Sequence, residues 1–179
     1  MTEEIIIAGF GGQGVMLIGR LLAHTAMTRG KHVSWMPAYG PEMRGGTANC
    51  SVVISDEPIG SPVVSEPDAL IAMNRPSLDK FLPAVKPGGL VVYNSSLIDV
   101  APQRCDLRTV AVRATDIAAE LGSVRAANMV ALGAYLQASG CIPADAVVDE
   151  MRTVLPDLSE YLTAINIEAL RRGSELARC

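Results

Sequence analysis

Residues 5–14 read Ile-Ile-Ile-Ala-Gly-Phe-Gly-Gly-Gln-Gly, a β-branched run that passes directly into a glycine-rich turn. The apolar run does not alternate with polar residues, which is typical of a strand covered on both faces. From Gly14 the apolar residues recur with helical spacing until the helix ends near Gly30. A second short strand is predicted over residues 32–36. This order predicts a βαβ unit whose two strands are parallel.

The rest of the chain continues the α/β pattern. Further strands are predicted over residues 47–55, 69–73, 90–93 and 107–112, with helical spacing over residues 78–85. After Asp116 every predicted element is helical, over residues 116–121, 124–138, 144–155 and 158–176. Residues 37–46 are expected to be irregular because they are rich in proline and glycine. No linker or repeat divides the sequence, so we expect one α/β domain over residues 1–179.

Composition excludes several function classes. With 15 basic and 19 acidic residues, the net charge is −4, and no basic cluster is present to neutralise nucleic-acid phosphates. The longest apolar stretch, residues 126–142, contains Asn128 and is shorter than the ~20 residues of a membrane-spanning helix. It is therefore predicted to be a buried helix. The acidic start of the chain is unlike a signal peptide, so we expect a cytoplasmic protein with no nucleic-acid or membrane partner.

Cysteine and histidine spacing does not predict a metal site. The four cysteines are widely separated, and no pair has the C-x₂-C spacing that brings two thiolates onto one metal or cluster. His24 lies within the first predicted helix, where a structural role is the simpler interpretation. We expect reduced cysteines and no metal ligands on this chain.

The glycines of the turn follow the pattern Gly9-x-Gly11-x-x-Gly14 between a predicted strand and helix. Such a turn exposes backbone N–H groups at a helix start, which favours a phosphate or carboxylate. The alternative is a tight turn that binds nothing. Dinucleotide-binding enzymes add an acidic residue at the end of the second strand, whereas residues 34–37 here are Ser-Trp-Met-Pro, which argues against NAD.

A second glycine pair, in the segment Lys86-Pro87-Gly88-Gly89, is similar to a turn in methyltransferases that use S-adenosylmethionine. The acidic residues that flank the glycine loop and follow the second strand in those enzymes are absent here. Termination of a helix before a buried strand is a sufficient explanation for this turn.

Residues 39–46 read Tyr-Gly-Pro-Glu-Met-Arg-Gly-Gly, a loop that combines a phenol, a carboxylate and a guanidinium. Arg44 has the fork geometry that pairs with a phosphate or with a partner's carboxylate, and Tyr39 is able to stack. The alternative is a surface turn with an internal pair between Glu42 and Arg44. Loops of this kind often carry function on a rigid scaffold.

The two glycine motifs, residues 9–14 and 39–46, resemble those of the gamma subunit of 2-oxoacid:ferredoxin (acceptor) oxidoreductases. Residues 68–74 and 86–89 are also similar to segments of that family, so the resemblance covers nearly the whole chain. It implies a Rossmann-like three-layer domain with a mostly parallel sheet and a helical C-terminal part. It also implies a role in the coenzyme A-dependent oxidative decarboxylation of a 2-oxoacid, 2-oxoglutarate or pyruvate, to an acyl-CoA, CO₂ and reduced ferredoxin.

The resemblance further implies a complex that holds thiamine diphosphate, Mg and iron–sulfur clusters. Its other members would be thiamine-binding alpha and beta subunits and a ferredoxin-like delta subunit. In this complex the two glycine loops would meet coenzyme A or a partner subunit. The residues assigned to this contact are Gly9, Gly11, Gly12, Gln13, Gly14, Tyr39, Glu42, Arg44, Gly45 and Gly46.

The residues also limit what this chain does by itself. No Gly-Asp-Gly motif is present for thiamine diphosphate, and the cysteines are not grouped for a cluster. We therefore assign no catalytic residue and expect the chain to act only as a subunit. Two alternatives stay open: a free-standing enzyme that binds NAD or S-adenosylmethionine, and a purely structural assembly subunit. The identity of the oxoacid and homodimer formation by the isolated chain also stay open.

Overall fold

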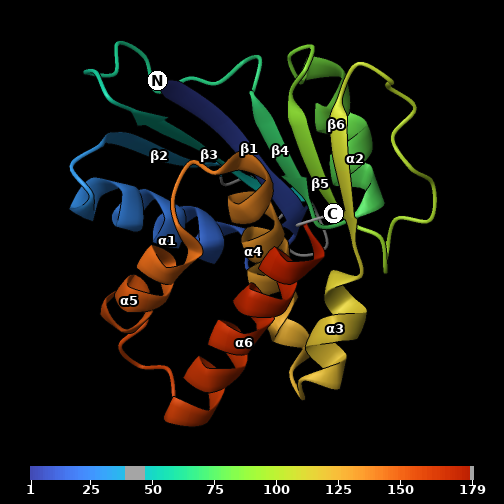
Figure 1. Cartoon of the computed structure of the whole chain (residues 1–179). Coiled ribbons are helices and arrows are strands. Elements are labelled where there is room, and N and C mark those ends of the chain that lie inside the picture. Colours follow the sequence, from blue (N-terminus) through green and yellow to red (C-terminus); the bar gives the residue numbers. More distant parts are fainter. Residues whose placement is uncertain (39–46, 178–179) are drawn as a thin grey trace.

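The computed structural model describes residues 1–38 and 47–177, which fold around a six-stranded sheet of order β2-β3-β1-β4-β5-β6 (Figure 1). The strands are β1 (Thr2–Phe10), β2 (His32–Ala38), β3 (Thr47–Ser55), β4 (Ala69–Ala72), β5 (Leu90–Asn94) and β6 (Arg108–Val112). Strands β1, β4, β5 and β6 are parallel neighbours, whereas β3 runs antiparallel to both β1 and β2. The expectation of a mostly parallel sheet is confirmed.

The βαβ prediction is correct in direction but omits a strand. Because β1 and β2 are each antiparallel to β3, they point the same way, yet β3 lies between them. Strand β2 is therefore an edge strand, and it extends through Pro37, which we expected in an irregular segment. An edge strand tolerates proline because its outward N–H groups need no partner in the ladder.

Helices cover both faces of the sheet unequally. They are α1 (Val15–Thr28), α2 (Arg75–Phe81), α3 (Ala114–Glu120), α4 (Ala127–Ser139), α5 (Ala144–Val154) and α6 (Glu160–Leu176), with short 3₁₀ turns at η1 (Leu82–Ala84) and η2 (Val124–Ala126). Ile5 and Ile7 pack into a large core with α1, α4, α5 and α6, while Ile6 and Ala8 pack into a smaller one that includes Leu78 of α2. Successive side chains of β1 thus point to opposite faces of the sheet and pack against different helical layers.

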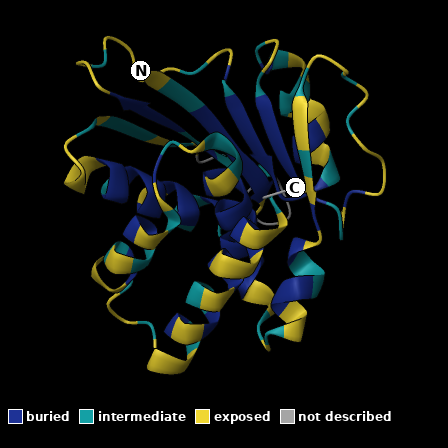
Figure 2. Ribbon diagram, in the orientation of Figure 1, coloured by how far each residue is buried: buried dark blue, intermediate teal, exposed yellow. Residues whose placement is uncertain are grey.

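Helix α4 is the centre of the larger layer. Its residues Ala127 to Leu136 are all buried, as expected from the apolar stretch of the sequence, and it packs closely against α6. Figure 2 shows the central strands buried and the outer sides of α5 and α6 exposed. Within the described ranges, none of the helices combines the length and apolar character needed to cross a membrane.

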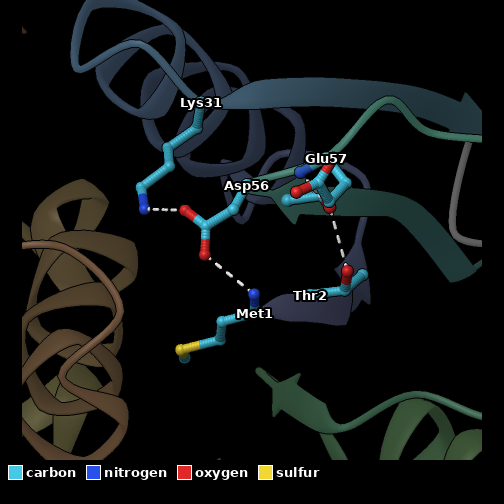
Figure 3. Close-up of polar contacts among 6 residues, drawn as sticks. Met1, Thr2, Lys31, Asp56 and Glu57 are labelled. Atoms are coloured by element: carbon cyan, nitrogen blue, oxygen red, sulfur yellow. Dashed lines mark hydrogen bonds and ion pairs between the residues drawn. The ribbon is translucent and has the colours of Figure 1, made fainter.

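Polar contacts fix the end of the sheet that lies farthest from the glycine turn (Figure 3). Asp56, just after β3, pairs with Lys31 and accepts a hydrogen bond of 2.8 Å from the amino group of Met1. The Oγ atoms of Thr2 and Ser55 are 2.9 Å apart. The hydrogen bond from Lys31, with that from the amino terminus, lowers the pKa of Asp56 from 3.8 to about 2.

We expect this carboxylate to contribute to acid stability. Its pKa is lower in the folded chain, so its contribution is present above the unfolded value of 3.8 and is lost as the pH falls towards 2. In urea unfolding measured from pH 5 to pH 2, Asp56→Asn should lose less stability over this range than the unmodified chain. Asp157→Asn, at an exposed aspartate outside the ion pairs of the described residues, is the control. Equal pH dependence in all three proteins would contradict the assignment.

Candidate functional site

The glycine turn lies where parallel strands end together. β1 ends at Phe10, β4 at Ala72 and β5 at Asn94, all at the same edge of the sheet. Open α/β sheets bind their ligands beyond the carboxyl ends of the strands. This edge is therefore the candidate binding site.

The glycines of the turn have two different roles. A Cβ atom on buried Gly9 would lie 2.8 Å from Gln13 Oε1 and 2.9 Å from Val15 Cγ1, and one on Gly14 would collide with the side-chain amide of Asn128. In contrast, Gly11 and Gly12 are exposed, and a Cβ on Gly12, where φ is +94°, would meet no atom of the described residues within 4 Å. Gly9 and Gly14 thus permit close internal packing, whereas Gly11 and Gly12 leave an open surface.

Gln13 locks the turn from inside. Its backbone N–H donates to the carbonyl oxygen of Phe10 (3.1 Å), and its Oε1 accepts from the Phe10 N–H (2.7 Å) and from Asn74 Nδ2 (2.9 Å). The N–H of Gln13, which we expected to face a ligand, is therefore already hydrogen-bonded. Among the described residues, no acceptor takes the N–H groups of Gly11, Gly12 and Gly14.

A second amide connects the turn to β5 and α3. Asn94, fully buried, donates through Nδ2 to the carbonyl oxygen of Met73 (3.3 Å) and to Thr115 Oγ1 (2.9 Å). Its Oδ1 accepts from the backbone N–H of Thr115 (3.3 Å). Gln13 Nε2 donates to the same Met73 carbonyl at 3.4 Å. The carbonyl at the end of β4 therefore holds both side-chain amides.

A cavity of about 160 Å³ opens between these groups. It is lined by Gly12, Gln13, Met73, Leu97, Thr115, Val124, Arg125 and Ala127. Arg125 is exposed and makes no ion pair with any residue in the described ranges. A cation without a partner among the described residues, beside open backbone N–H groups, suits an anionic ligand or an acidic partner surface.

A larger polar cavity, about 260 Å³, lies at the opposite edge of the sheet and differs in charge. There Lys86 Nζ is 2.8 Å from both Glu4 Oε2 and Asp68 Oδ1, and these hydrogen bonds raise the pKa of Lys86. The charge of Lys86 is satisfied within the chain, and Arg108, another lining residue, donates to the carbonyl oxygen of Ala138. Because the carboxylates of Glu3 and Asp68 also line this cavity, it is a weaker candidate for anion binding.

The donor groups of the described residues do not fit a metal or cluster. No group of three or more His, Cys, Asp or Glu is assembled in residues 1–38 and 47–177. Cys50 is buried, and desolvation raises the pKa of its thiol to about 12, which disfavours the thiolate that a metal needs. His24 Nε2 lies 3.1 Å from Glu150 Oε2 and joins α1 to α5, consistent with a structural role.

The second glycine loop, residues 39–46, lies outside the described part of the chain. Tyr39, Glu42, Arg44, Gly45 and Gly46 lie outside the described residues, so their roles stay predictions from the sequence.

Sequence reasoning also missed five residues of this edge: Asn74, Asn94, Thr115, Arg125 and Asn128. Asn74 and Asn94 close predicted strands, a position that signals a ligand edge. Thr115 and Arg125 carried no signal in the sequence.

The sheet order further disfavours the dinucleotide alternative. In that fold the ribose-binding acid follows the strand next to β1 on the helix-crossover side. Here antiparallel β3 occupies that place and pairs with β1 along its whole length, from Thr2–Ser55 to Phe10–Thr47.

Comparison with known proteins assigns the chain to a family. Residues 4–176 match the model of the family described as pyruvate ferredoxin/flavodoxin oxidoreductase. The chain belongs to this family. The resemblance seen in the two glycine motifs is thereby confirmed.

Two curated family members differ in how much of their length the chain covers. Ketoisovalerate oxidoreductase subunit VorA of Methanothermobacter marburgensis is 45% identical over 98% of this chain, but the chain spans only 36% of VorA. 2-Oxoglutarate synthase subunit KorC of the same organism is 36% identical, and the match covers 98% of this chain and 97% of KorC.

Solved structures of the family have the same fold. The gamma subunit of keto/oxoacid ferredoxin oxidoreductase from Geobacter sulfurreducens is 32% identical with a TM-score of 0.83, and 98% of each chain is covered. 2-Oxoglutarate:ferredoxin oxidoreductase from Magnetococcus marinus, solved with 2-oxoglutarate, coenzyme A and succinyl-CoA bound, is 27% identical with a TM-score of 0.88. That match covers 99% of this chain and 31% of the other.

Proposed function

We propose that this chain is the gamma-type subunit of a 2-oxoacid:ferredoxin oxidoreductase. The observation that carries the proposal is the match to KorC, which covers nearly the full length of both chains. The complex would convert a 2-oxoacid and coenzyme A to an acyl-CoA, CO₂ and reduced ferredoxin in the cytoplasm. The relatives name ketoisovalerate and 2-oxoglutarate, and either substrate is compatible with the identities of 45% and 36%.

In this proposal the redox groups belong to other subunits. Thiamine diphosphate with Mg and the iron–sulfur clusters would be held by alpha, beta and ferredoxin-like delta subunits, because the described donor groups of this chain do not fit them. The chain, as a single gamma-type domain, contributes the edge formed by Gly11, Gly12 and Arg125. This edge would bind an anionic part of coenzyme A, with Arg44 as a further predicted contact from the sequence.

Reconstitution with thiamine-binding and cluster-binding subunits from the same organism would test the proposal. Coenzyme A-dependent reduction of ferredoxin should require this chain, and the purified chain alone should show no turnover. Turnover by the isolated chain with NAD or S-adenosylmethionine would instead support a free-standing enzyme.

The glycine turn has a matched test within the reconstituted complex. Gly12→Ala and Gly30→Ala both place alanine at positive φ (+94° and +78°) with nothing within 4 Å, so their backbone strain is comparable. Gly12 faces the proposed ligand, whereas Gly30 follows α1 at the other end of that helix. We expect Gly12→Ala to raise the KM for coenzyme A about tenfold and Gly30→Ala to leave it within about twofold. Equal effects of the two changes, with assembly intact, would favour a purely structural subunit.

A further inference from the structure

The orientation of the Asn94 side chain is dictated by backbone groups. Its Nδ2 faces the Met73 carbonyl oxygen, and its Oδ1 faces the N–H of Thr115. If the amide were rotated by half a turn, oxygen would face oxygen and N–H would face N–H. Because Asn94 is fully buried, water cannot compensate such contacts. The remaining Nδ2 hydrogen therefore always points to Thr115 Oγ1.

This orientation fixes what Thr115 offers to the cavity. Its hydroxyl oxygen already accepts from Asn94, so its own hydrogen has to be donated elsewhere. No acceptor within the described residues takes that hydrogen. Thr115 lines the cavity of about 160 Å³, and its hydroxyl is thus a donor towards the cavity.

Gln13 is fixed by the same logic from the other side. Asn74 Oδ1 accepts from the backbone N–H of Ser77 (3.0 Å), so its Nδ2 must donate to Gln13 Oε1. The Phe10 N–H donates to that oxygen as well. The amide nitrogen of Gln13 therefore faces the cavity edge, with one hydrogen on Met73 and one to spare.

We infer that the cavity is built to bind a group that only accepts hydrogen bonds, and that Thr115 contacts it with a polarity set by Asn94. Four of its lining residues carry donor hydrogens with no acceptor among the described residues, namely the Gly12 N–H, one hydrogen of Gln13 Nε2, the Thr115 hydroxyl and the Arg125 guanidinium. The carbonyl oxygen of Met73, another lining residue, already accepts from two side-chain donors. Arg125 adds positive charge, which favours a phosphate over a neutral carbonyl.

The size and remaining walls of the cavity refine the ligand class. A volume of about 160 Å³ is below the ~300–1,000 Å³ of sites that enclose a whole small molecule. It suits one phosphate group with an apolar segment against Leu97 and Val124, which are 48% and 58% exposed. A phosphate of coenzyme A is the source that the proposed function supplies, and this identification rests on that function.

The site itself is tested on the isolated chain with inorganic pyrophosphate as the probe. In ¹H–¹⁵N NMR titrations, the amides of Gly12 and Thr115 should shift, and Thr115→Val should weaken pyrophosphate binding about tenfold while Thr115→Ser restores it. Asn94→Asp should weaken it similarly without touching the ligand, because its carboxylate would take the Thr115 hydrogen. Thr109→Val, at an exposed threonine of β6, is the matched control. Where Asn94→Asp does not fold, the Val and Ser pair at position 115 decides.

The reconstituted complex gives the second readout. The KM for coenzyme A should rise about tenfold in Thr115→Val and return within about twofold of the original in Thr115→Ser, with kcat little changed. If pyrophosphate binding depends on Thr115 but the complex shows no coenzyme A-dependent turnover, the site is supported and the proposed function is overturned. If turnover is normal and Thr115→Val changes neither the affinity for pyrophosphate nor the KM for coenzyme A, the inference is overturned and the proposed function stands.

Discussion

Gly133→Ala is expected to lower the free energy of unfolding by about 1–3 kcal/mol, the usual range for overpacking. Alanine is normally the better helix former by about 1 kcal/mol, so propensity alone predicts the opposite sign. A Cβ on Gly133 of α4, however, would collide with the carbonyl oxygen of Leu170 in α6 and lie 2.8 Å from its carbonyl carbon. These are backbone atoms, which do not rotate away as a side chain does.

The packing of the two helices is reciprocal, which strengthens the expected sign. A Cβ on Gly173 of α6 would collide with the carbonyl oxygen of Val130 in α4, and Ser174 Oγ lies 3.0 Å from the Gly133 carbonyl oxygen. Any separation of the helices thus weakens a buried hydrogen bond as well. Urea unfolding followed by circular dichroism would measure the change, with Thr153→Ala at an exposed position of α5 as the control. A Gly133→Ala chain more stable than the original would refute this close approach.

Local patterns predicted the elements that depend on neighbours in sequence. The apolar run at residues 5–8 predicted β1, and the stripe after Gly14 predicted α1. The position of β3 between β1 and β2 was not predictable in this way, because strand pairing joins residues far apart in the chain. For the same reason Pro37 was expected in a loop, since its place on an edge strand follows from the sheet order.

In the candidate site, too, local motifs were predictable from the sequence, whereas contacts between distant residues were not. The glycine motif located the turn, but only the structure separates buried Gly9 from exposed Gly12. Thr115 and Arg125 reach the same cavity because β1, β4 and β5 end side by side and η2 lies beyond them. That convergence depends on tertiary contacts, for which a single sequence carries no period or motif.

Gly14→Ala is expected to have the largest effect of all, lowering the free energy of unfolding by about 2–5 kcal/mol. Gly14 caps α1 in the left-handed region (φ 73°, ψ 20°), where an alanine is strained by about 1–2 kcal/mol. Its added methyl would also collide with the side-chain amide of Asn128, which is 2% exposed and cannot move into solvent. That collision adds an overpacking term of about 1–3 kcal/mol.

A double-mutant cycle with Asn128→Ala separates the two contributions. The Asn128 amide donates to the carbonyl oxygen of Gly14 at 3.2 Å, so its removal alone should lower stability by about 1 kcal/mol. It also removes the atoms that the new methyl would meet. The double variant should therefore be more stable than the sum of the single changes by about 1–3 kcal/mol, whereas distant sites are additive.

The Gly30→Ala variant supplies the reference for backbone strain without a collision. Its φ of +78° is close to that of Gly14, but a Cβ there meets nothing within 4 Å. Gly14→Ala should exceed its destabilisation by the collision term, and Asn128→Ala should remove that excess. Strict additivity between the changes at positions 14 and 128 would mean that Gly14 is required only for its backbone conformation. The observed contact instead makes it the point where the glycine turn is held against the central helix, so that loss of the contact should also displace Gly12 from the cavity.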